Sequence, residues 1–456
     1  MEGVSAMEGP AIKIRSIDAF DIRGKTVIFR PDINSPIDPG TRKIVNTNRL
    51  GKTVPTLAKL LEGGARVAMI AHQGDTLDYQ NLIPMAEHAE ILGKLMGRKI
   101  GYIDDVCGPA AQAAVRSLKD GECVLLGNLR YLAEEISGFE KEVKLKPQEM
   151  LETWLVRSLA PLADLYVNDA FAAAHRNAPS MVAFQEILPS AGGLQLVEEY
   201  TALKSVMDSP RRPCVFVLGG AKISDAFSMM RKVLEDGAAD AILTAGVTGL
   251  VMHIARGRDL GAATAKFLKD KALDEFIPEA KDLLARWSDK FVLPVDLAYE
   301  ADGQRAEVDV AAIGAEAAGT AGGPGPGAAA GKFDKVLFPD VGGKTIALFR
   351  ERIAAASSVF VNGPAGMYED ARWEKGTREI WNAIADAPGY TVVGGGDTIS
   401  AAARFTDLEK YGYVCTGGGA MVRFLAGKKL PLIEAMEQAY DKPYVFDRNL
   451  KTQPRK

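Results

Sequence analysis

The most constraining feature of this chain is an alternation of short apolar runs with longer segments of helical periodicity. Such strand–helix–strand alternation is typical of parallel sheets covered by helices on both faces, and uninterrupted apolar strands fit sheets buried on both sides. We therefore predict an α/β fold. The predicted strands are VIFR (27–30), VAMIAH (67–72), CVLLGNL (123–129), LYVNDAF (165–171), CVFVLGG (214–220), AILTAG (241–246), FVLPVD (291–296), SVFVNGPAG (358–366), YTVVGGGD (390–397) and YVCTGGG (413–419).

The runs fall into two sets, which predicts two doubly wound, Rossmann-like parallel-sheet domains. One set lies within residues 1–193 and the other within residues 214–430, and 456 residues are enough for two cores. The segment between them, 194–213, has helical periodicity and ends at prolines, so we expect an interdomain helix and hinge there. Segment 311–332 is low-complexity Ala, Gly and Pro and is expected to be a flexible surface insertion.

The charge balance excludes partners that need a strongly basic protein. Lys plus Arg is 55 and Asp plus Glu is 59, a net charge of −4, so we expect binding neither to nucleic acid nor to a membrane surface. No apolar run approaches the roughly 18 residues of a spanning helix, and the N-terminus lacks the apolar core of a signal peptide. Four widely spaced cysteines without a C-x-x-C motif fit a reduced, cytoplasmic chain.

Glycine clusters follow four strands of the second set. In open α/β folds ligands bind at the carboxyl ends of strands, and the following helix N-termini offer unpaired N–H groups to phosphates. Lys222 would add a point charge, and Asp397 could hold Mg²⁺. One cluster alone would more often be a tight turn, but four at strand-to-helix junctions indicate a phosphate site. They are LGGAK (218–222), NGPAG (362–366), GGGDT (394–398) and TGGGA (416–420).

Basic residues instead mark the strand ends of the first set. Several arginines that face one point suit a dianionic phosphate and a carboxylate, which they bind bidentately. The alternative is a scatter of surface charges. With glycine loops in one half and basic residues in the other, the layout is that of a hinge-bending phosphotransferase. The polar residues at these strand ends are Arg30, Asp32, Asn34, Arg49, His72, Arg130, His175 and Arg176.

Taken in order, these segments resemble those of phosphoglycerate kinases, most closely the archaeal type. The resemblance implies two similar α/β domains, with 3-phosphoglycerate on the first and Mg-ATP or Mg-ADP on the second. It implies that segment 431–456 returns to the first domain, and that the chain is a monomer, with a dimer as the alternative. The matching segments are FRPDINSPIDP, NRLGKTVPTL, AHQG, LGNLRYLAEE, VNDAFAAAHR, RPCVFVLGGAK, LPVD, NGPAG, GGGDT and TGGGA.

The resemblance also implies a role for each matching position. It gives Arg49, Lys222, Gly396 and Gly419 to the phosphoryl group in transfer. Substrate-binding positions are Arg30, Asp32, Asn34, His72, Arg130 and Arg176. Nucleotide-binding positions are Gly219, Gly220, Lys222, Asn362, Glu369, Gly394, Gly395, Thr398, Gly417 and Gly418, and Asp397 binds the metal. The implied reaction is the glycolytic and gluconeogenic one, reversible phosphoryl transfer between ATP and the carboxylate of 3-phosphoglycerate.

The first half departs from the family pattern at Asp75, where an arginine that contacts the acceptor's phosphate is expected. This leaves three hypotheses open. In one, neighbouring arginines compensate and 3-phosphoglycerate remains the acceptor. In another, the chain is an ATP-dependent kinase of a different small carboxylate. In the last, it is a nucleotide-binding module without catalysis, although the presence of Arg49, Lys222 and Asp397 argues against this.

Overall fold

The computed structural model describes residues 11–75, 79–313 and 331–442. Its contacts divide the chain into two compact units. The N-terminal unit comprises Ala11–Thr201 together with the chain from Lys429 onward, and the C-terminal unit comprises Ala202–Lys428. Most of the predicted insertion lies outside the described residues.

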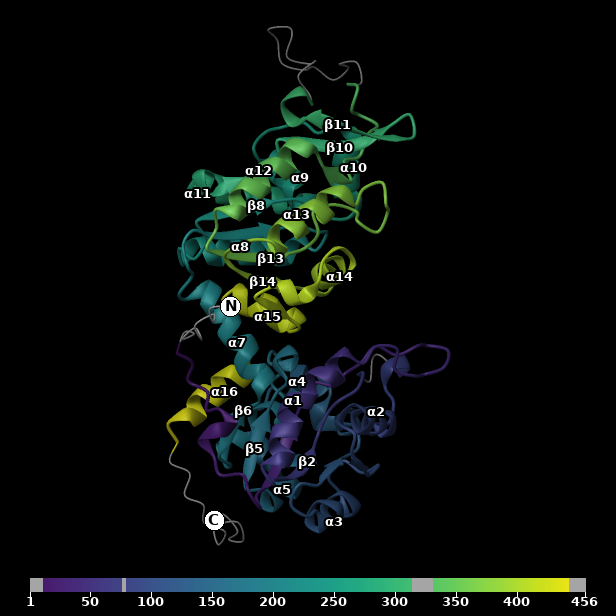
Figure 1. Ribbon diagram of the computed structural model, residues 1–456, viewed down its shortest axis with the longest axis vertical. Coiled ribbons are helices and arrows are strands. Elements are labelled where there is room, and N and C mark those ends of the chain that lie inside the picture. The colour runs from purple at the N-terminus through teal and green to yellow at the C-terminus, as the bar shows by residue number, and fades with distance from the viewer. Residues whose placement is uncertain (1–10, 76–78, 314–330, 443–456) are drawn as a thin grey trace, which may run out of the picture. The chain divides into compact units, whose positions relative to one another are not determined.

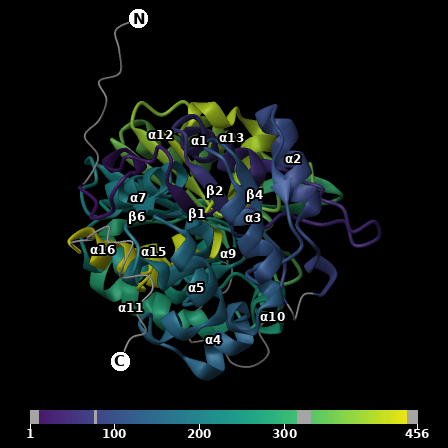
Figure 2. The same ribbon diagram turned by 90° about the horizontal axis from the view of Figure 1, so that it is seen from below.

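The N-terminal unit is built on a six-stranded, wholly parallel sheet (Figures 1 and 2). Its strands in spatial order are β3 (Gly101–Tyr102), β4 (Cys123–Leu125), β2 (Arg66–Met69), β1 (Thr26–Arg30), β5 (Leu165–Asn168) and β6 (Ser190–Gly192). Its α-helices are α1 (Asn48–Glu62), α2 (Ala86–Met96), α3 (Pro109–Ser117), α4 (Ser137–Val143), α5 (Trp154–Leu159), α6 (Pro179–Val182) and α16 (Pro431–Tyr440).

Side-chain alternation fixes how this sheet is covered. Successive strand residues point to opposite faces, so Val27 and Phe29 of β1 share one face. They join a buried cluster with Leu57 and Leu60 of α1 and Leu92 of α2. The apolar residues of α1 recur at helical spacing and form the stripe that covers this face.

The C-terminal unit repeats this design with a second six-stranded parallel sheet. The strands in spatial order are β15 (Tyr413–Cys415), β14 (Tyr390–Gly394), β13 (Ser358–Asn362), β7 (Cys214–Leu218), β8 (Ala241–Thr244) and β9 (Phe291–Val292). The helices are α8 (Ile223–Glu235), α9 (Gly246–Ala255), α10 (Ala262–Asp270), α11 (Ile277–Trp287), α12 (Gly343–Ala354), α13 (Lys375–Ala385), α14 (Gly396–Phe405) and α15 (Gly418–Leu425). The prediction of two parallel-sheet α/β domains is confirmed.

One predicted strand is corrected. FVLPVD (291–296) does not form a single strand, because β9 ends at Val292 and a new strand begins at Asp296. Pro294 has no N–H for a strand ladder, so the run breaks there. The second piece belongs to a small antiparallel sheet that the sequence did not reveal, with the order β11 (Gln304–Asp309), β10 (Asp296–Ala301) and β12 (Asp340–Val341).

Helix α7 (Leu194–Met207) begins in the N-terminal unit and continues into the C-terminal unit. It is shorter than the predicted segment 194–213. Its N-terminus is fixed by side chains of the N-terminal unit, because Thr56 Oγ1 accepts the Leu194 N–H at 3.0 Å and Asp169 Oδ1 accepts the Leu196 N–H at 2.8 Å.

Candidate active site

The polar residues of the N-terminal unit lie where neighbouring parallel strands end. Arg30 is the last residue of β1, His72 closely follows β2, and Arg130 and Arg176 follow β4 and β5. These four strands are consecutive in the sheet order β4-β2-β1-β5, so their carboxyl ends meet at one edge. The fold thus brings the predicted basic residues to the same edge of the sheet.

Arg30 and His72 form the buried centre of this edge. Arg30 is 2% exposed, and its Nη2 lies 2.8 Å from His72 Nδ1. Because a guanidinium only donates, Nδ1 accepts and a neutral His72 carries its proton on Nε2. Burial, together with Arg30, Arg130 and other nearby arginines, holds the pKa of His72 well below its ordinary value. His72 is therefore neutral near pH 7 and offers an N–H donor from Nε2.

A side-chain scaffold holds the loops beside them. Asn128 Oδ1 accepts the backbone N–H groups of Gln73 at 3.1 Å and Arg130 at 3.0 Å. Arg130 Nε donates to the Gly74 carbonyl at 3.1 Å, and its Nη1 donates to the Glu135 carbonyl. Burial lowers the pKa of Arg130 to about 10, with Arg176 acting in the same direction. Sequence reasoning missed Gln73 and Asn128 as scaffold residues, because a buried amide carries no distinctive spacing.

The loop after β1 and the start of α1 supply the two residues of a partly exposed ion pair. Arg49 Nη1 lies 2.7 Å from Asp32 Oδ2, and Arg49 is 38% exposed while Asp32 is 6% exposed. Asn34 Oδ1 accepts the Gly74 N–H at 3.0 Å, so Asn34 holds the loop that follows β2. The structure therefore pairs the predicted catalytic Arg49 with the predicted substrate residue Asp32.

Asp75 also lies among these basic residues. Its Oδ2 is 3.7 Å from Arg130 Nε and 3.9 Å from Arg176 Nη1. It also accepts a hydrogen bond from Ser137 Oγ at 2.5 Å. Arg176 has a closer partner in Glu140, whose Oε2 is 2.6 Å from Nε. Ser137 and Glu140 come from α4, whose sequence reads as an ordinary exposed helix, and sequence reasoning missed both.

In the C-terminal unit, two glycine loops are packed backbone against backbone. The Gly219 N–H donates to the Asn362 carbonyl at 2.9 Å, and the Gly220 N–H donates to the Pro364 carbonyl at 2.7 Å. A Cβ on Gly219 would clash with the Pro364 carbonyl, and one on Gly363 would clash with the Gly219 carbonyl. Gly363 also has φ +86°, a conformation that favours glycine. These glycines are needed for the contact between the loops.

The glycine loop after β14 is bound to the loop after β13 through two side chains. Asn362 Nδ2 donates to the Gly394 carbonyl at 2.8 Å, and Thr398 Oγ1 accepts the Gly363 N–H at 2.7 Å. Gly395 has φ +98° and sits against the Asn362 amide. The structure therefore brings Asn362, Gly394, Gly395 and Thr398 together, whereas Glu369 is an exposed residue of the loop after β13.

Lys222 and Asp397 face one another at two helix starts. Lys222 precedes α8 and Asp397 lies in the first turn of α14, with Nζ 3.1 Å from Oδ2. Both are exposed, at 76% and 64%. At Gly396, and at Gly418 and Gly419 of α15, an added Cβ would meet no atom within 4 Å. These glycines leave backbone N–H groups of two helix starts open to an anion; Gly417 is the N-cap of α15.

The donor set suits Mg²⁺ rather than a fully protein-coordinated metal. Mg²⁺ binds through one or two carboxylates, substrate phosphates and water. Asp397 supplies an exposed carboxylate of this kind. Across the described residues, no group of three or more His, Cys, Asp or Glu is placed to hold a metal ion. Among the same residues, no helix is long and apolar enough to cross a membrane.

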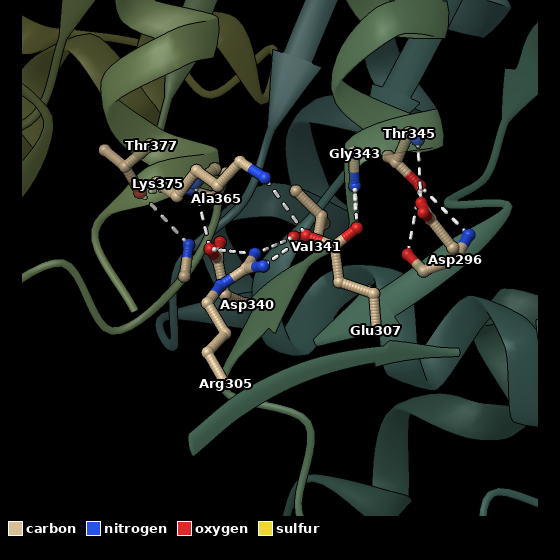
Figure 3. A network of polar contacts seen from close by, with 12 residues as sticks. Asp296, Arg305, Glu307, Asp340, Val341, Gly343, Thr345, Ala365, Lys375 and Thr377 are labelled. Atoms are coloured by element: carbon tan, nitrogen blue, oxygen red, sulfur yellow. Dashed lines mark hydrogen bonds and ion pairs between the residues drawn. The ribbon is translucent and has the colours of Figure 1, made fainter. Parts of the chain in front are cut away.

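A polar network of the small antiparallel sheet supports the loop after β13 (Figure 3). Asp340 accepts hydrogen bonds from Arg305 Nη2 at 3.0 Å and from the Gly376 N–H at 2.9 Å. Thr377 Oγ1 accepts the Ala365 N–H at 3.1 Å. Burial raises the pKa of Asp340 to about 6. The start of α13 is therefore tied both to the sheet and to the glycine loop, an arrangement that the sequence did not reveal.

Known proteins share this architecture and sequence. A family model described as phosphoglycerate kinase matches residues 17–428. The phosphoglycerate kinase of Methanothermobacter thermautotrophicus is 36% identical over 94% of this chain and 98% of its own length. That of Thermococcus kodakarensis is 37% identical over 93% and 98%.

Solved structures agree with these sequence matches. The crystal structure of phosphoglycerate kinase from Pyrococcus horikoshii has a TM-score of 0.79 and 33% identity, covering 94% of this chain and all of that one. The phosphoglycerate kinase from Coxiella burnetii has a TM-score of 0.75 and 26% identity, covering 93% and 99%. The chain belongs to the phosphoglycerate kinase family, phosphotransferases that act on a carboxyl group.

Proposed function

We propose that this chain transfers a phosphoryl group reversibly between ATP and the carboxylate of 3-phosphoglycerate. In the reverse direction, 1,3-bisphosphoglycerate and ADP give 3-phosphoglycerate and ATP. The acceptor binds at the basic edge of the N-terminal sheet through Arg30, Asp32, Asn34, His72, Arg130 and Arg176. The nucleotide binds at the glycine loops of the C-terminal sheet through Gly219, Gly220, Lys222, Asn362, Glu369, Gly394, Gly395, Thr398, Gly417 and Gly418.

The observation that carries the acceptor site is the environment of Arg30. This guanidinium is buried, and its hydrogen-bond partners are His72 Nδ1, Ser180 Oγ and the Pro31 carbonyl, all uncharged. A buried cation is costly unless anions neutralise it. The buried Glu135, which accepts a hydrogen bond from Ser180 Oγ at 2.7 Å, and Asp32 supply part of that neutralisation. The position of Arg30 beside a neutral His72 with an N–H to donate suits a phosphate or carboxylate ligand.

Catalysis follows from position and charge. The acceptor carboxylate is already ionised near pH 7, so the reaction needs no general base. Arg49 and Lys222 neutralise charge on the phosphoryl group in transfer, and the N–H groups at Gly396 and Gly419 stabilise it. Mg²⁺, held by Asp397, would supply further charge neutralisation on the nucleotide phosphates.

The wider setting follows from the same chemistry. Direct transfer requires donor and acceptor to meet with water excluded, so we propose that the two units are domains that close by bending at 194–213. Residues 1–193 and 214–430 would be the two domains, with 431–456 completing the first. We place the enzyme in the cytoplasm, as a monomer, in glycolysis or gluconeogenesis.

The test is ATP turnover by the purified chain with Mg²⁺ and 3-phosphoglycerate. We expect turnover that is abolished by a chelator and restored by added Mg²⁺. Asp397→Asn should reduce it at least tenfold at limiting Mg²⁺. Asp386→Asn is the matched control, because Asp386 is also an exposed carboxylate of this unit paired with a lysine, 2.9 Å from Lys410 Nζ. Folded protein without turnover would refute the proposal.

The alternative of a different carboxylate acceptor finds no support among the relatives described above, which are named phosphoglycerate kinases. The same assay checks it directly. Replacing 3-phosphoglycerate by other small carboxylates should lower turnover, and a carboxylate that is turned over faster would revive this alternative.

A further inference from the structure

Two carboxylates approach Arg176, and they are held in different ways. Glu140 is 2.6 Å from Arg176 Nε through one oxygen and accepts the Asn177 N–H at 2.7 Å through the other. Both of its oxygens are therefore engaged in holding local structure. Asp75 Oδ2 is 3.9 Å from Arg176 Nη1 and 3.7 Å from Arg130 Nε, longer than a hydrogen bond.

Asp75 Oδ2 thus neutralises two arginines from beyond hydrogen-bond distance. Within the part of the chain that the structure describes, Arg176 Nη2 is buried and has no hydrogen-bond partner. Arg130 and Arg176 are 5% and 14% exposed, so their charges are poorly screened by water and a nearby anion is favourable. Asp75 is anchored by Ser137 Oγ at 2.5 Å, a side chain of a different element.

We propose that Asp75 is an internal counter-anion of the acceptor site, which the phosphate of the acceptor displaces or repels when it binds to Arg130 and Arg176. Asp75 then determines specificity through affinity: it weakens binding of a dianionic phosphate and does not touch the reacting carboxylate. The inference rests on the proposed function for the identity of the acceptor. The electrostatic competition itself concerns any phosphate.

Asp75→Asn tests this, with inorganic phosphate as the probe in calorimetric titrations. The amide keeps the size and a hydrogen-bond acceptor for Ser137 but removes the charge. We expect phosphate to bind about tenfold more tightly, because two unit charges about 4 Å apart near a protein surface interact by more than this change in affinity requires. The KM for 3-phosphoglycerate should fall by a similar factor, with the effect on KM larger than that on kcat.

The matched control is Asp120→Asn. Asp120 is also a carboxylate of the N-terminal unit paired with an arginine, 3.3 Å from Arg66 Nε. It precedes β4, whereas Arg130 follows β4, so the same charge is removed at the opposite edge of the sheet. Phosphate affinity should stay within about twofold of the parent. Phosphate that binds to the C-terminal unit contributes equally in every variant.

Ser137→Ala provides a second route if Asp75→Asn fails to fold. Loss of one hydrogen bond weakens the anchoring of Asp75 beside the arginines, and phosphate should bind about threefold more tightly. Unchanged or weaker phosphate binding in folded Asp75→Asn would overturn the proposal, and so would unchanged binding in Ser137→Ala if that variant alone folds. If phosphate binding tightens but 3-phosphoglycerate is not turned over, the proposed function fails and the counter-anion stands. If 3-phosphoglycerate is turned over but phosphate binding does not change, the counter-anion fails and the proposed function stands.

Discussion

The anion sites proposed at the two sheets are opposite in construction. At the N-terminal sheet, Arg30 and His72 are buried side chains fixed by one another and by the loops around them. At the C-terminal sheet, Lys222 and Asp397 are exposed, and the fixed part is the backbone of the glycine loops. A site built from fixed side chains can select one small acid by the geometry of its hydrogen bonds. A site built from backbone N–H groups at helix starts binds phosphate groups in general. Substitutions should therefore couple activity to stability in the first site and separate them in the second.

The largest effect is expected from Lys222→Ala. Loss of a charge that we propose to stabilise the transferring phosphoryl group should lower kcat by about 10²–10³-fold. Because Lys222 is 76% exposed, the denaturant midpoint should stay within error of the parent. Lys410→Ala removes a comparable exposed lysine, paired with Asp386, and should leave kcat unchanged. A Lys222→Ala variant with the kcat of the parent would show that Lys222 has no role in catalysis.

Arg30→Lys should instead reduce activity and stability together. Lysine keeps the charge but not the fork that reaches His72 and the Pro31 carbonyl, so buried acceptors lose their donors. We expect the free energy of unfolding to fall by about 2 kcal/mol. The KM for 3-phosphoglycerate should rise at least tenfold. Arg157→Lys, at an arginine 69% exposed, is the control for the substitution type. Loss of activity with full stability would contradict the contrast between the sites.

Two glycine substitutions separate the backbone's structural role from its binding role. Gly219→Ala forces a Cβ against the Pro364 carbonyl and should cost about 1–3 kcal/mol in urea unfolding. Gly419→Ala meets open space and should leave the unfolding free energy within about 0.5 kcal/mol. The KM for ATP should nevertheless rise several-fold, because the methyl group would occupy the position where we propose that a phosphate binds. Equal destabilisation by both substitutions would contradict this division.

An effect on the pH dependence of stability is expected from His253, away from both proposed sites. His253 of α9 donates from Nε2 to the Pro294 carbonyl at 2.8 Å, and burial lowers its pKa to about 4. The unfolded chain binds this proton near pH 6.5, so the stabilisation is complete above pH 6.5 and is lost as the pH falls toward 4.

Denaturant unfolding at two pH values measures this contribution. Between pH 7.5 and pH 5, the parent should lose about 2 kcal/mol of stability through His253. His253→Gln should lack that loss, whatever its stability at pH 7.5. The reference is the parent protein, unfolded at the same two pH values. A second histidine variant at His175 would not serve as a control, because His175 adjoins Arg176 of the proposed acceptor site. An identical pH dependence in both proteins would show that His253 does not titrate in this way.

The sequence predicted the parts of the molecule that have local signatures. Apolar runs and glycine clusters revealed the main parallel strands and the loops after β7, β13, β14 and β15. The short strands β3 and β6 and the antiparallel sheet were missed. Strand β11 contains only exposed and half-buried residues and carries little apolar signal.

The site was predictable only where residue type and strand position coincide. Arg30 and His72 meet because β1 and β2 are neighbours, which strand-end reasoning anticipates. The ion pair of Glu140 with Arg176 and the hydrogen bond from Ser137 to Asp75 depend on where α4 packs, and no local sequence pattern indicates that. The catalytic and binding roles themselves remain predictions.

The return of α16 to the N-terminal unit has a consequence for synthesis on the ribosome. Helix α16 packs against α6 and β6, with Leu432 N–H donating to the Ala174 carbonyl at 3.2 Å and Tyr200 Oη donating to Glu437 at 2.9 Å. In the sequence, Ala202–Lys428 of the C-terminal unit lies between the two parts of the N-terminal unit. The half that is translated first therefore remains unfinished until α16 emerges, whereas the half translated second can fold first as a complete unit.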